Sequence, residues 1–299
     1  MSHWVNEKCV SFVQILCIKI VKMIDVVIPK HIAIIMDGNR RFAKRDGLKT
    51  SDGHSRGFDK LAEAMKWCIE LGIKELTVYA FSIENFKRSD EEVAALAVLA
   101  RSKLQLLLDS IDTFNAYGVS LRFVGRWSLL SDEIRVLSSR AIIATRRGND
   151  KLRLNVAFAY TGRDEIGRTA SILVDSVKNE ELLPEDIDED LVSQTMELGE
   201  PDLLIRTSGE VRLSDFMMWQ ISRTVLYFTE TLWPEFSFYG FLGALIHFHL
   251  YAPPSQIIRE NNERKKMFLS RLEKRRWQEV ENFVDYPIPN TGAELHNKF

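Results

Sequence analysis

After Pro29, short runs of apolar residues alternate with stretches in which apolar residues recur at helical spacing. Short runs in which every position is apolar predict buried strands, whereas apolar residues three or four positions apart predict amphipathic helices. These patterns predict strands at residues 32–36, 76–81, 119–124, 152–159 and 202–205. They predict helices at residues 58–72, 90–114, 131–146 and 163–177, the first of which has Gly72 as a natural stop.

This alternation of strands and helices predicts an α/β fold. Successive parallel strands need crossover connections, and helices supply them, so we expect a central, mostly parallel sheet covered by helices on both faces. Pro253 and Pro254 end the alternating pattern. We therefore predict an N-terminal helical segment over 1–28, a main domain over 29–252 and a charged helical tail over 253–299.

The N-terminal segment has the pattern of an amphipathic helix. Apolar residues recur at helical spacing between residues 10 and 24, but Lys19, Lys22 and Asp25 interrupt them. A membrane-spanning helix needs about 20 mostly apolar residues with few charges. The segment can instead dock on its own domain, lie on a membrane surface, or do both.

The C-terminal tail allows two interpretations. Its many charged residues are typical of a solvated helix face. It also carries apolar residues that favour a contact with another subunit. These are Ile257, Met267, Phe268, Leu272 and Trp277.

Composition and charge exclude several classes of protein. The 299 residues carry a net charge of −2, which gives no indication of a nucleic-acid partner. The three cysteines are too few for a disulfide framework or a zinc site, so a reducing compartment fits best. The chain has no P-loop and no Asp-Asp-x-x-Asp pair.

Residues with candidate chemistry follow the first predicted strand, where open α/β sheets bind ligands. Asp37 offers a hard oxygen ligand for Mg²⁺, and Gly38 lets a ligand approach the backbone closely. Arg40 and Arg41 suit phosphate oxygens, because guanidinium groups bind them in a forked geometry. The simpler alternative is a turn in which Asp37 pairs with Arg41.

Two further predicted strand ends carry polar groups. Ser82, Glu84, Asn85 and Arg88 follow the second strand, and the strand at 202–205 leads into another cationic segment. That segment contains Arg206, Arg212 and Ser214, with Gly209 as its turn. Two basic pockets and one acidic metal ligand together predict two phosphorylated substrates.

Five stretches resemble the signature regions of the cis-prenyltransferase family, in the family's order and over roughly residues 29–250. They are HIAIIMDGNRRFAK (31–44), GHSRGF (53–58), YAFSIENFKR (79–88), LNVAFAYTGRDEI (154–166) and IRTSGEVRLSDFMMWQ (205–220). The resemblance implies the undecaprenyl diphosphate synthase-like fold, with an elongated apolar tunnel for the growing isoprenoid. It also implies that the main domain is catalytic.

The resemblance assigns roles to individual residues. Farnesyl diphosphate would bind with Mg²⁺ at Asp37, the metal ligand, and at Gly38, Arg40, Arg41 and His54. Isopentenyl diphosphate would bind at Arg88, Arg206, Arg212 and Ser214. Asn39 and Ser82 match positions linked to substrate orientation and proton transfer, which places them with Asp37 in the catalytic set. Phe42, Phe81 and Phe86 would flank the isoprenoid. Val93, Leu96, Leu104 and Leu108 line the tunnel or simply pack in the core.

The sequence variants RRFAK and SGEVRLS resemble the eukaryotic branch of the family. That likeness implies synthesis of a long polyprenyl diphosphate, the dolichol precursor for protein glycosylation. It also implies a peripheral location on the cytosolic face of the endoplasmic reticulum membrane.

Several positions depart from the bacterial pattern. Val225 stands where bacterial relatives carry a second carboxylate, Val211 where they carry a histidine, and Thr50 where many relatives have a basic residue. No Arg-x-Gly element occurs after residue 250. Eukaryotic relatives with this gap obtain the element from a partner that resembles the Nogo-B receptor, so the resemblance implies an obligate heteromer.

The sequence disfavours two rival functions. A non-catalytic regulatory subunit of the same complex should have lost part of the set Asp37, Arg41, Ser82, Arg206 and Arg212, which is complete here. A haloacid-dehalogenase-like phosphatase needs a second aspartate two positions from the first. Residues 35 and 39 are isoleucine and asparagine.

Overall fold

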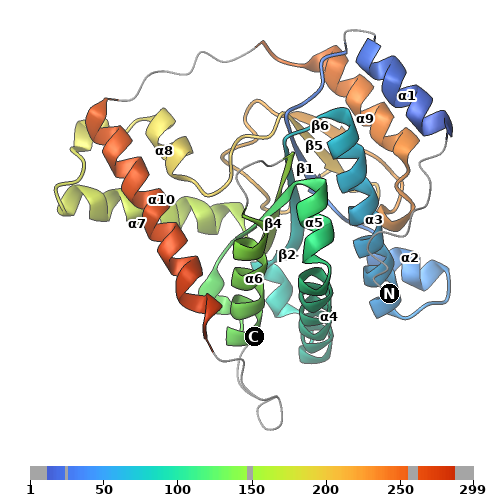
Figure 1. The fold of residues 1–299 in the computed structure, drawn as a ribbon, viewed down its shortest axis with the longest axis horizontal. Coiled ribbons are helices and arrows are strands. Elements are labelled where there is room, and N and C mark those ends of the chain that lie inside the picture. Colours follow the sequence, from blue (N-terminus) through green and yellow to red (C-terminus); the bar gives the residue numbers. More distant parts are fainter. Residues whose placement is uncertain (1–11, 24–25, 147–150, 255–261, 287–299) are drawn as a thin grey trace.

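A single six-stranded sheet forms the centre of the protein. The computed structural model describes residues 12–23, 26–146, 151–254 and 262–286 (Figure 1). The strand order is β3-β4-β2-β1-β5-β6, and every neighbouring pair is parallel, as the alternating pattern predicts. The strands are β1 (His31–Ile35), β2 (Glu75–Ser82), β3 (Val119–Val124), β4 (Leu152–Tyr160), β5 (Leu203–Arg206) and β6 (Val225–Phe228).

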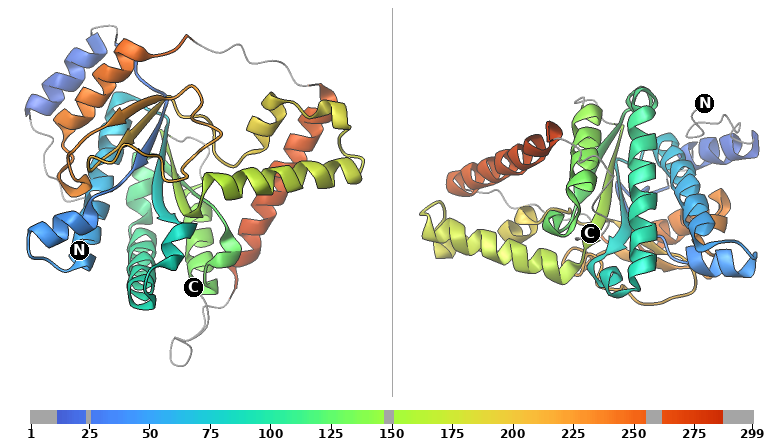
Figure 2. Two further views of the ribbon diagram at one scale, coloured as in Figure 1. Left: turned by 180° about the vertical axis from the view of Figure 1, so that it is seen from behind. Right: turned by 90° about the horizontal axis from the view of Figure 1, so that it is seen from below.

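The two faces of the sheet are covered differently. Ile32 and Ile34 of β1 face a large core that includes residues of α3, α5, α6 and α9, whereas Ala33 and Ile35 face a smaller core that includes Phe216. Helices therefore cover one face, and the long connection after β5 covers much of the other (Figure 2). The helices are α1 (Phe12–Met23), α2 (Asn39–Arg45), α3 (Thr50–Leu71), α4 (Asp90–Asp109), α5 (Ile111–Tyr117), α6 (Asp132–Thr145), α7 (Gly162–Lys178), α8 (Glu189–Thr195), α9 (Phe238–Tyr251) and α10 (Glu263–Val284).

Local sequence signals explain where most of these elements begin and end. Gly72 ends α3 in the left-handed region, at φ 82°, as predicted. Thr161 caps α7 by accepting a hydrogen bond from the Asp164 amide. The helix predicted over 90–114 was wrong in one respect, because the backbone leaves helical geometry at Ser110 (φ −109°, ψ 16°) and separates α4 from α5. β6 was not among the predicted strands.

The N-terminal helix packs against its own chain. α1 lies beside α9 in both views of that region (Figures 1 and 2), and Cys17 and Ile18 contact the main core. This supports the docking interpretation. Leu16 and Met23 remain exposed on the same helix. No helix in the described parts of the chain is long and apolar enough to span a membrane.

Intrachain packing accounts for part of the apolar tail. Phe268 and Leu272 of α10 are buried against residues of α7 and α8, including Leu173 and Leu191. Met267 is exposed, and Ile257 lies outside the described residues. The tail is therefore neither a fully solvated helix nor wholly available to another subunit.

Candidate active site

The candidate site lies at the carboxyl edge of the sheet, where three adjacent strands end. β2, β1 and β5 are neighbours in that order. Asp37 follows β1, Ser82 ends β2 and Arg206 ends β5. Parallel strands direct their carboxyl ends to one edge, so the topology brings together residues that lie far apart in the sequence.

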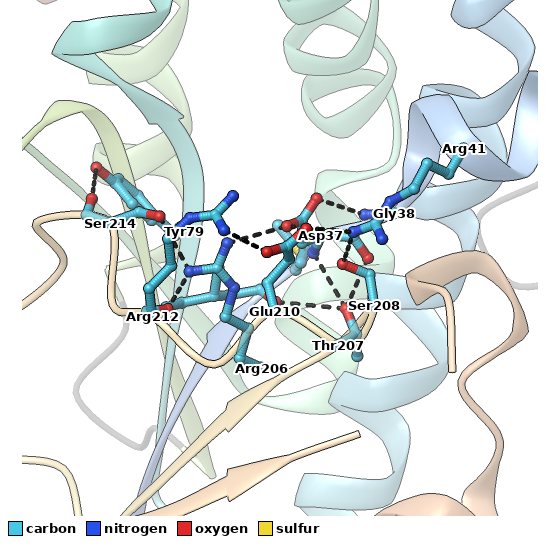
Figure 3. Close-up of polar contacts among 12 residues, drawn as sticks. Asp37, Gly38, Arg41, Tyr79, Arg206, Thr207, Ser208, Glu210, Arg212 and Ser214 are labelled. Carbon is cyan, nitrogen blue, oxygen red and sulfur yellow. Dashed lines mark hydrogen bonds and ion pairs between the residues drawn. The ribbon is translucent and has the colours of Figure 1, made fainter. Parts of the chain in front are cut away.

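The carboxylate of Asp37 accepts hydrogen bonds from a side chain and from the backbone (Figure 3). Its Oδ2 accepts a hydrogen bond from Arg206 Nη2 at 3.0 Å, and its Oδ1 accepts one from the Gly38 amide at 2.7 Å. Burial alone would raise the pKa of Asp37, but these two donors outweigh it and lower the pKa below its ordinary value. The carboxylate is therefore ionised at neutral pH. Arg41 lies farther off, at 3.8 Å, so the simple Asp37–Arg41 turn is not its main interaction.

The turn after Asp37 depends on close packing. Gly38 has φ 109°, and a Cβ there would lie 3.0 Å from Leu232. Asn39 begins α2 and donates to the Met36 carbonyl, while its buried Oδ1 has no hydrogen-bond partner among the residues the structure describes. A Cβ at Gly57 would lie 2.2 Å from that Oδ1. The packing thus fixes Asn39 beside the predicted allylic site.

Arg206 links the two predicted substrate sites. Its side chain is only 3% exposed. It donates to Asp37, to Ser214 Oγ at 3.0 Å and to the Arg212 carbonyl oxygen. Ser214 adopts φ 50°, and its carbonyl accepts a hydrogen bond from the Tyr79 hydroxyl at 3.3 Å (Figure 3). A buried, always charged group therefore spans the centre of the site.

The side chains of Arg41 and Arg212 lie at the rim and share one carboxylate. Arg41 approaches Glu210 at 3.6 Å and also contacts Ser208 Oγ. Arg212 forms an ion pair with the same Glu210. The two predicted basic pockets are therefore parts of one continuous site rather than separate ones.

The far wall of the site comes from α3 and the segment after β2. Ser82 caps a short helix over Ile83–Lys87, where its Oγ accepts a hydrogen bond from the Glu84 amide. Arg88 and Arg40 both donate to Glu92 Oε1, at 2.8 and 3.4 Å. His54 Nε2 is buried without a partner in the described structure.

Two groups on this wall have lowered pKa values. Burial, followed by repulsion from Arg88 and Arg40, lowers the pKa of His54 to about 4. Burial and the nearby Arg40 also lower the pKa of Arg88. An anion placed between these groups would offset that repulsion.

One cavity of about 1050 Å³ connects these polar groups with an apolar interior. Leu96 and Leu104 of α4 line it, whereas Val93 and Leu108 are absent from its lining and pack in the protein interior. Of the three predicted aromatic walls, only Phe81 lines the cavity. The isoprenoid contact expected of Phe42 and Phe86 stays a prediction.

Phe42 and Phe86 lie behind the cavity wall for different reasons. Phe42 is buried, with the guanidinium groups of Arg45 and Arg56 each 5.4 Å from its ring centre. Phe86 packs edge-on against Phe81, with ring centres 4.9 Å apart. Phe86 therefore supports the ring of Phe81, which lines the cavity.

Sequence reasoning missed several residues that build the site. Thr207 Oγ1 accepts a hydrogen bond from the Asp37 amide at 3.1 Å and lies 2.7 Å from the Asp37 carbonyl oxygen. Ser208 and Glu210 contact Arg41, and Trp233 donates its amide to the Asp37 carbonyl. Thr207, Ser208 and Glu210 stand inside the RTSGE stretch already singled out, but the Trp233 contact comes from a distant segment with no such signal.

The donor set around Asp37 fits Mg²⁺ that is bound largely through a substrate. The described residues contain no group of three or more His, Cys, Asp or Glu side chains that could hold a metal. Asp37 supplies one ionised and partly exposed carboxylate. Mg²⁺ commonly uses one or two carboxylates together with phosphate oxygens and waters.

Comparisons with known proteins agree with this geometry. The family model described as "Putative undecaprenyl diphosphate synthase" matches residues 35–252. The human dehydrodolichyl diphosphate synthase complex subunit DHDDS is 44% identical over 90% of this chain and 81% of its own length. The geranylgeranyl-diphosphate-specific tritrans,polycis-undecaprenyl-diphosphate synthase of Pyrococcus abyssi is 43% identical over 81% of this chain and 87% of its own length.

Solved structures show the same fold. The crystal structure of lavandulyl diphosphate synthase from Lavandula x intermedia, in complex with dimethylallyl diphosphate, has a TM-score of 0.70 at 33% identity. It covers 75% of this chain and 97% of its own. A probable undecaprenyl diphosphate synthase from Campylobacter jejuni has a TM-score of 0.62 at 30% identity, covering 77% of this chain and 97% of its own.

The chain belongs to the cis-prenyltransferase family. It is therefore a prenyltransferase of isoprenyl diphosphate substrates. This membership contradicts the phosphatase alternative, whose second aspartate is also missing beside Asp37.

Proposed function

We propose that this chain is the catalytic subunit of a cis-polyprenyl diphosphate synthase that condenses isopentenyl diphosphate with farnesyl diphosphate. The observation that carries the proposal is the position of Arg206. This one buried guanidinium contacts Asp37 on the predicted allylic side and Ser214 on the predicted isopentenyl side. A group in that position can hold two diphosphates next to each other, which the condensation requires.

The rim arginines complete the two proposed diphosphate sites. Arg40, Arg41 and His54 would bind the allylic diphosphate near the Gly38 turn. Arg88, Arg206, Arg212 and Ser214 would bind isopentenyl diphosphate. Asp37 would hold Mg²⁺, which when bound would neutralise charge on the allylic diphosphate. Preorganised cations of this kind stabilise the charge that develops on a departing diphosphate.

The remaining residues would orient the substrates and move a proton. Ser82 stands at the end of β2 and lines the same cavity as the arginines, and its Oγ accepts a hydrogen bond from the Glu84 amide. Asn39 keeps an unpartnered buried oxygen on the allylic side. The homoallylic double bond would attack the allylic carbon, diphosphate would leave, and loss of a proton would set the new cis double bond. We assign these two side chains to substrate orientation and proton transfer.

The apolar part of the cavity would receive the growing isoprenoid. Phe81 and Leu104 lie along its wall, and their burial excludes water from the hydrocarbon chain. We propose that this cavity is the elongated tunnel expected of the family.

The names of two relatives support the biological setting that we propose. The human and mouse relatives are both named dehydrodolichyl diphosphate synthase complex subunits. We propose that this chain makes the dolichol precursor in an obligate heteromer with a subunit resembling the Nogo-B receptor. Leu16 and Met23, exposed on α1, support peripheral contact with the endoplasmic reticulum membrane on its cytosolic face.

Incorporation of labelled isopentenyl diphosphate tests the proposal. The purified chain should be weakly active alone, and a Nogo-B receptor-like partner should raise its rate by about 10²–10³, the usual effect of adding a missing charge-stabilising element. Chain length is then read by product sizing. Full activity of an isolated homodimer would contradict the heteromer.

The regulatory alternative gives a different result in the same assay. Asp37→Ala in this chain should abolish incorporation by the complex if this chain is catalytic. Unchanged activity of the complex with that variant would place catalysis in the partner.

A further inference from the structure

A second cavity, of about 440 Å³, lies between the edge strand β3 and helix α10. Figure 1 shows α10 passing α7 and α8 toward α6 on this side of the sheet. Leu121 and Phe123 of β3 line both this cavity and the large one, so the strand forms a wall between them. None of the predicted active-site residues lines the second cavity.

The lining of this second cavity is strongly basic. It contains six arginines and three glutamates, which leaves an excess of three positive charges. A concave surface with one dominant sign of charge concentrates ions of the opposite sign. The arginines are Arg122, Arg126, Arg146, Arg153, Arg168 and Arg276.

Some of these arginines have partners within the protein. Arg126 forms an ion pair with Asp164 at 2.7 Å, and Arg276 donates to the Thr195 carbonyl at 2.6 Å. The side chains of Arg122 and Arg153 make no hydrogen bond or ion pair with any residue in the described structure. The cavity therefore presents guanidinium groups whose hydrogen-bonding capacity is not used by the fold.

The electrostatic balance of the cavity also favours an added anion. Burial, followed by repulsion from Arg122, lowers the pKa of Arg276 to about 10. Burial likewise lowers the pKa of Arg122, and Glu273 offsets the effect only in part. A bound dianion would supply the missing compensation.

We propose that the second cavity binds a small phosphate-bearing anion, held by the guanidinium groups of Arg122, Arg153 and Arg276. Guanidinium forks match phosphate oxygens in two parallel hydrogen bonds. The volume lies within the range of small-molecule sites, about 300–1,000 Å³. Trp127 and Trp277 also line the cavity, and the guanidinium of Arg146 lies 3.8 Å from the centre of the Trp277 ring.

The test uses inorganic diphosphate as the probe and the full chain labelled with 5-fluorotryptophan. Trp277 lines the second cavity and Trp233 lines the large one, so their ¹⁹F NMR signals report the two sites separately. Trp277→Phe and Trp233→Phe assign the signals. We expect diphosphate to shift the Trp277 signal saturably in the unmodified chain.

The variants decide whether the arginines of this cavity hold the anion. Arg122→Gln should weaken the Trp277 response by about tenfold or more and leave the Trp233 response in place. Lys274→Gln removes one charge from the exposed side of α10, outside the cavity, and should leave both responses unchanged. Arg153→Gln, at an exposed position, repeats the test if Arg122→Gln does not fold.

Three results would overturn the proposal. The first is a Trp277 signal that diphosphate does not move up to millimolar concentration. The second is equal weakening by Arg122→Gln and Lys274→Gln, which would indicate nonspecific screening. The third is binding of a short polyglutamate peptide at least as tightly as diphosphate, which would identify an acidic segment as the occupant.

Discussion

The arginines of the active site fall into two groups that differ in how firmly the fold holds them. Arg206 is 3% exposed and donates to Asp37, Ser214 and the Arg212 carbonyl oxygen. Arg41 and Arg212 are 50% and 67% exposed. Both of these rim arginines have Glu210 as an ion-pair partner. The site therefore combines one fixed charge with several that can change partners.

This difference suggests a division of labour. Exposed ion pairs contribute little stability, about 0–1 kcal/mol, so phosphate oxygens can replace Glu210 at small cost. A buried guanidinium needs no such rearrangement, because its position is set before substrate arrives. We infer that Arg206 organises the site and that the rim arginines capture substrates. The predictions below test that distinction.

Replacing Arg206 should have the largest effect. Arg206→Gln removes the fixed charge and takes one hydrogen-bond donor from each of Asp37 and Ser214. We expect incorporation of isopentenyl diphosphate to fall by about 10²–10³. The free energy of unfolding, measured by denaturant titration, should fall by about 1–3 kcal/mol, because the hydrogen bond between a buried guanidinium and a carboxylate is lost.

Arg206→Lys is the matched control. It keeps the charge but cannot donate from two nitrogens, so it should recover stability more than activity. Equal activity in the lysine variant and the unmodified chain would contradict a role that depends on the forked geometry.

Asp37→Asn should reduce activity more than stability. The amide keeps the shape of the carboxylate but takes the counter-charge from buried Arg206, so the free energy of unfolding should fall by about 1–3 kcal/mol. Activity should fall by about 10² or more, since the proposed metal ligand is lost. Activity within tenfold of the unmodified chain at saturating Mg²⁺ would remove Asp37 from the catalytic set.

Much of the fixed part of the site was predictable from the sequence. Asp37, Ser82 and Arg206 each follow a short apolar run, and parallel strands place such residues at one edge. The hydrogen bond from the Trp233 backbone amide to the Asp37 carbonyl oxygen was not predictable, because it depends on packing between distant segments. The spacing of apolar residues along the chain predicts helices and strands, but it does not identify which side chains come into contact after folding.

The same limit applies to the predicted aromatic walls. Phe42, Phe81 and Phe86 all lie in signature stretches, and of these three Phe81 lines the cavity. The ring of Phe42 packs near the guanidinium groups of Arg45 and Arg56. A motif identifies a residue that matters for the local structure. The direction of that residue's side chain depends on how its helix or strand packs against neighbouring elements.

The rim arginines should affect substrate binding more than the fold. Arg212→Ala should raise the apparent KM for isopentenyl diphosphate by about tenfold, since a charged hydrogen-bonding group is lost. Arg41→Ala should instead raise the apparent KM for the allylic diphosphate. Each substrate is varied in turn with the other saturating, and a reversed pattern would mean that the two sites are exchanged. Arg163→Ala, which removes another exposed arginine of the same cavity, is the control for the loss of one positive charge there.

A pH-dependent effect should come from His54, whose charged form is disfavoured by burial and by the nearby Arg88 and Arg40. Burial and the neighbouring Arg88 and Arg40 lower its pKa from 6.5 to about 4, so it is neutral in the folded protein at neutral pH. Between those two pH values the unfolded chain binds more protons than the folded chain. Stability should therefore fall as pH decreases from about 6.5 to about 4 and stay level above that range, as far as His54 is concerned.

The contribution of His54 is isolated by comparing the unmodified chain with His54→Asn. His31 also has a lowered pKa, caused mainly by burial, but it is present in both proteins and cancels in the difference. The unmodified chain should lose at most about 3 kcal/mol more than the variant over that interval, measured by urea unfolding at each pH. Identical pH profiles would show that His54 does not stay neutral beside Arg88 and Arg40, and the electrostatic description of that wall would need to change.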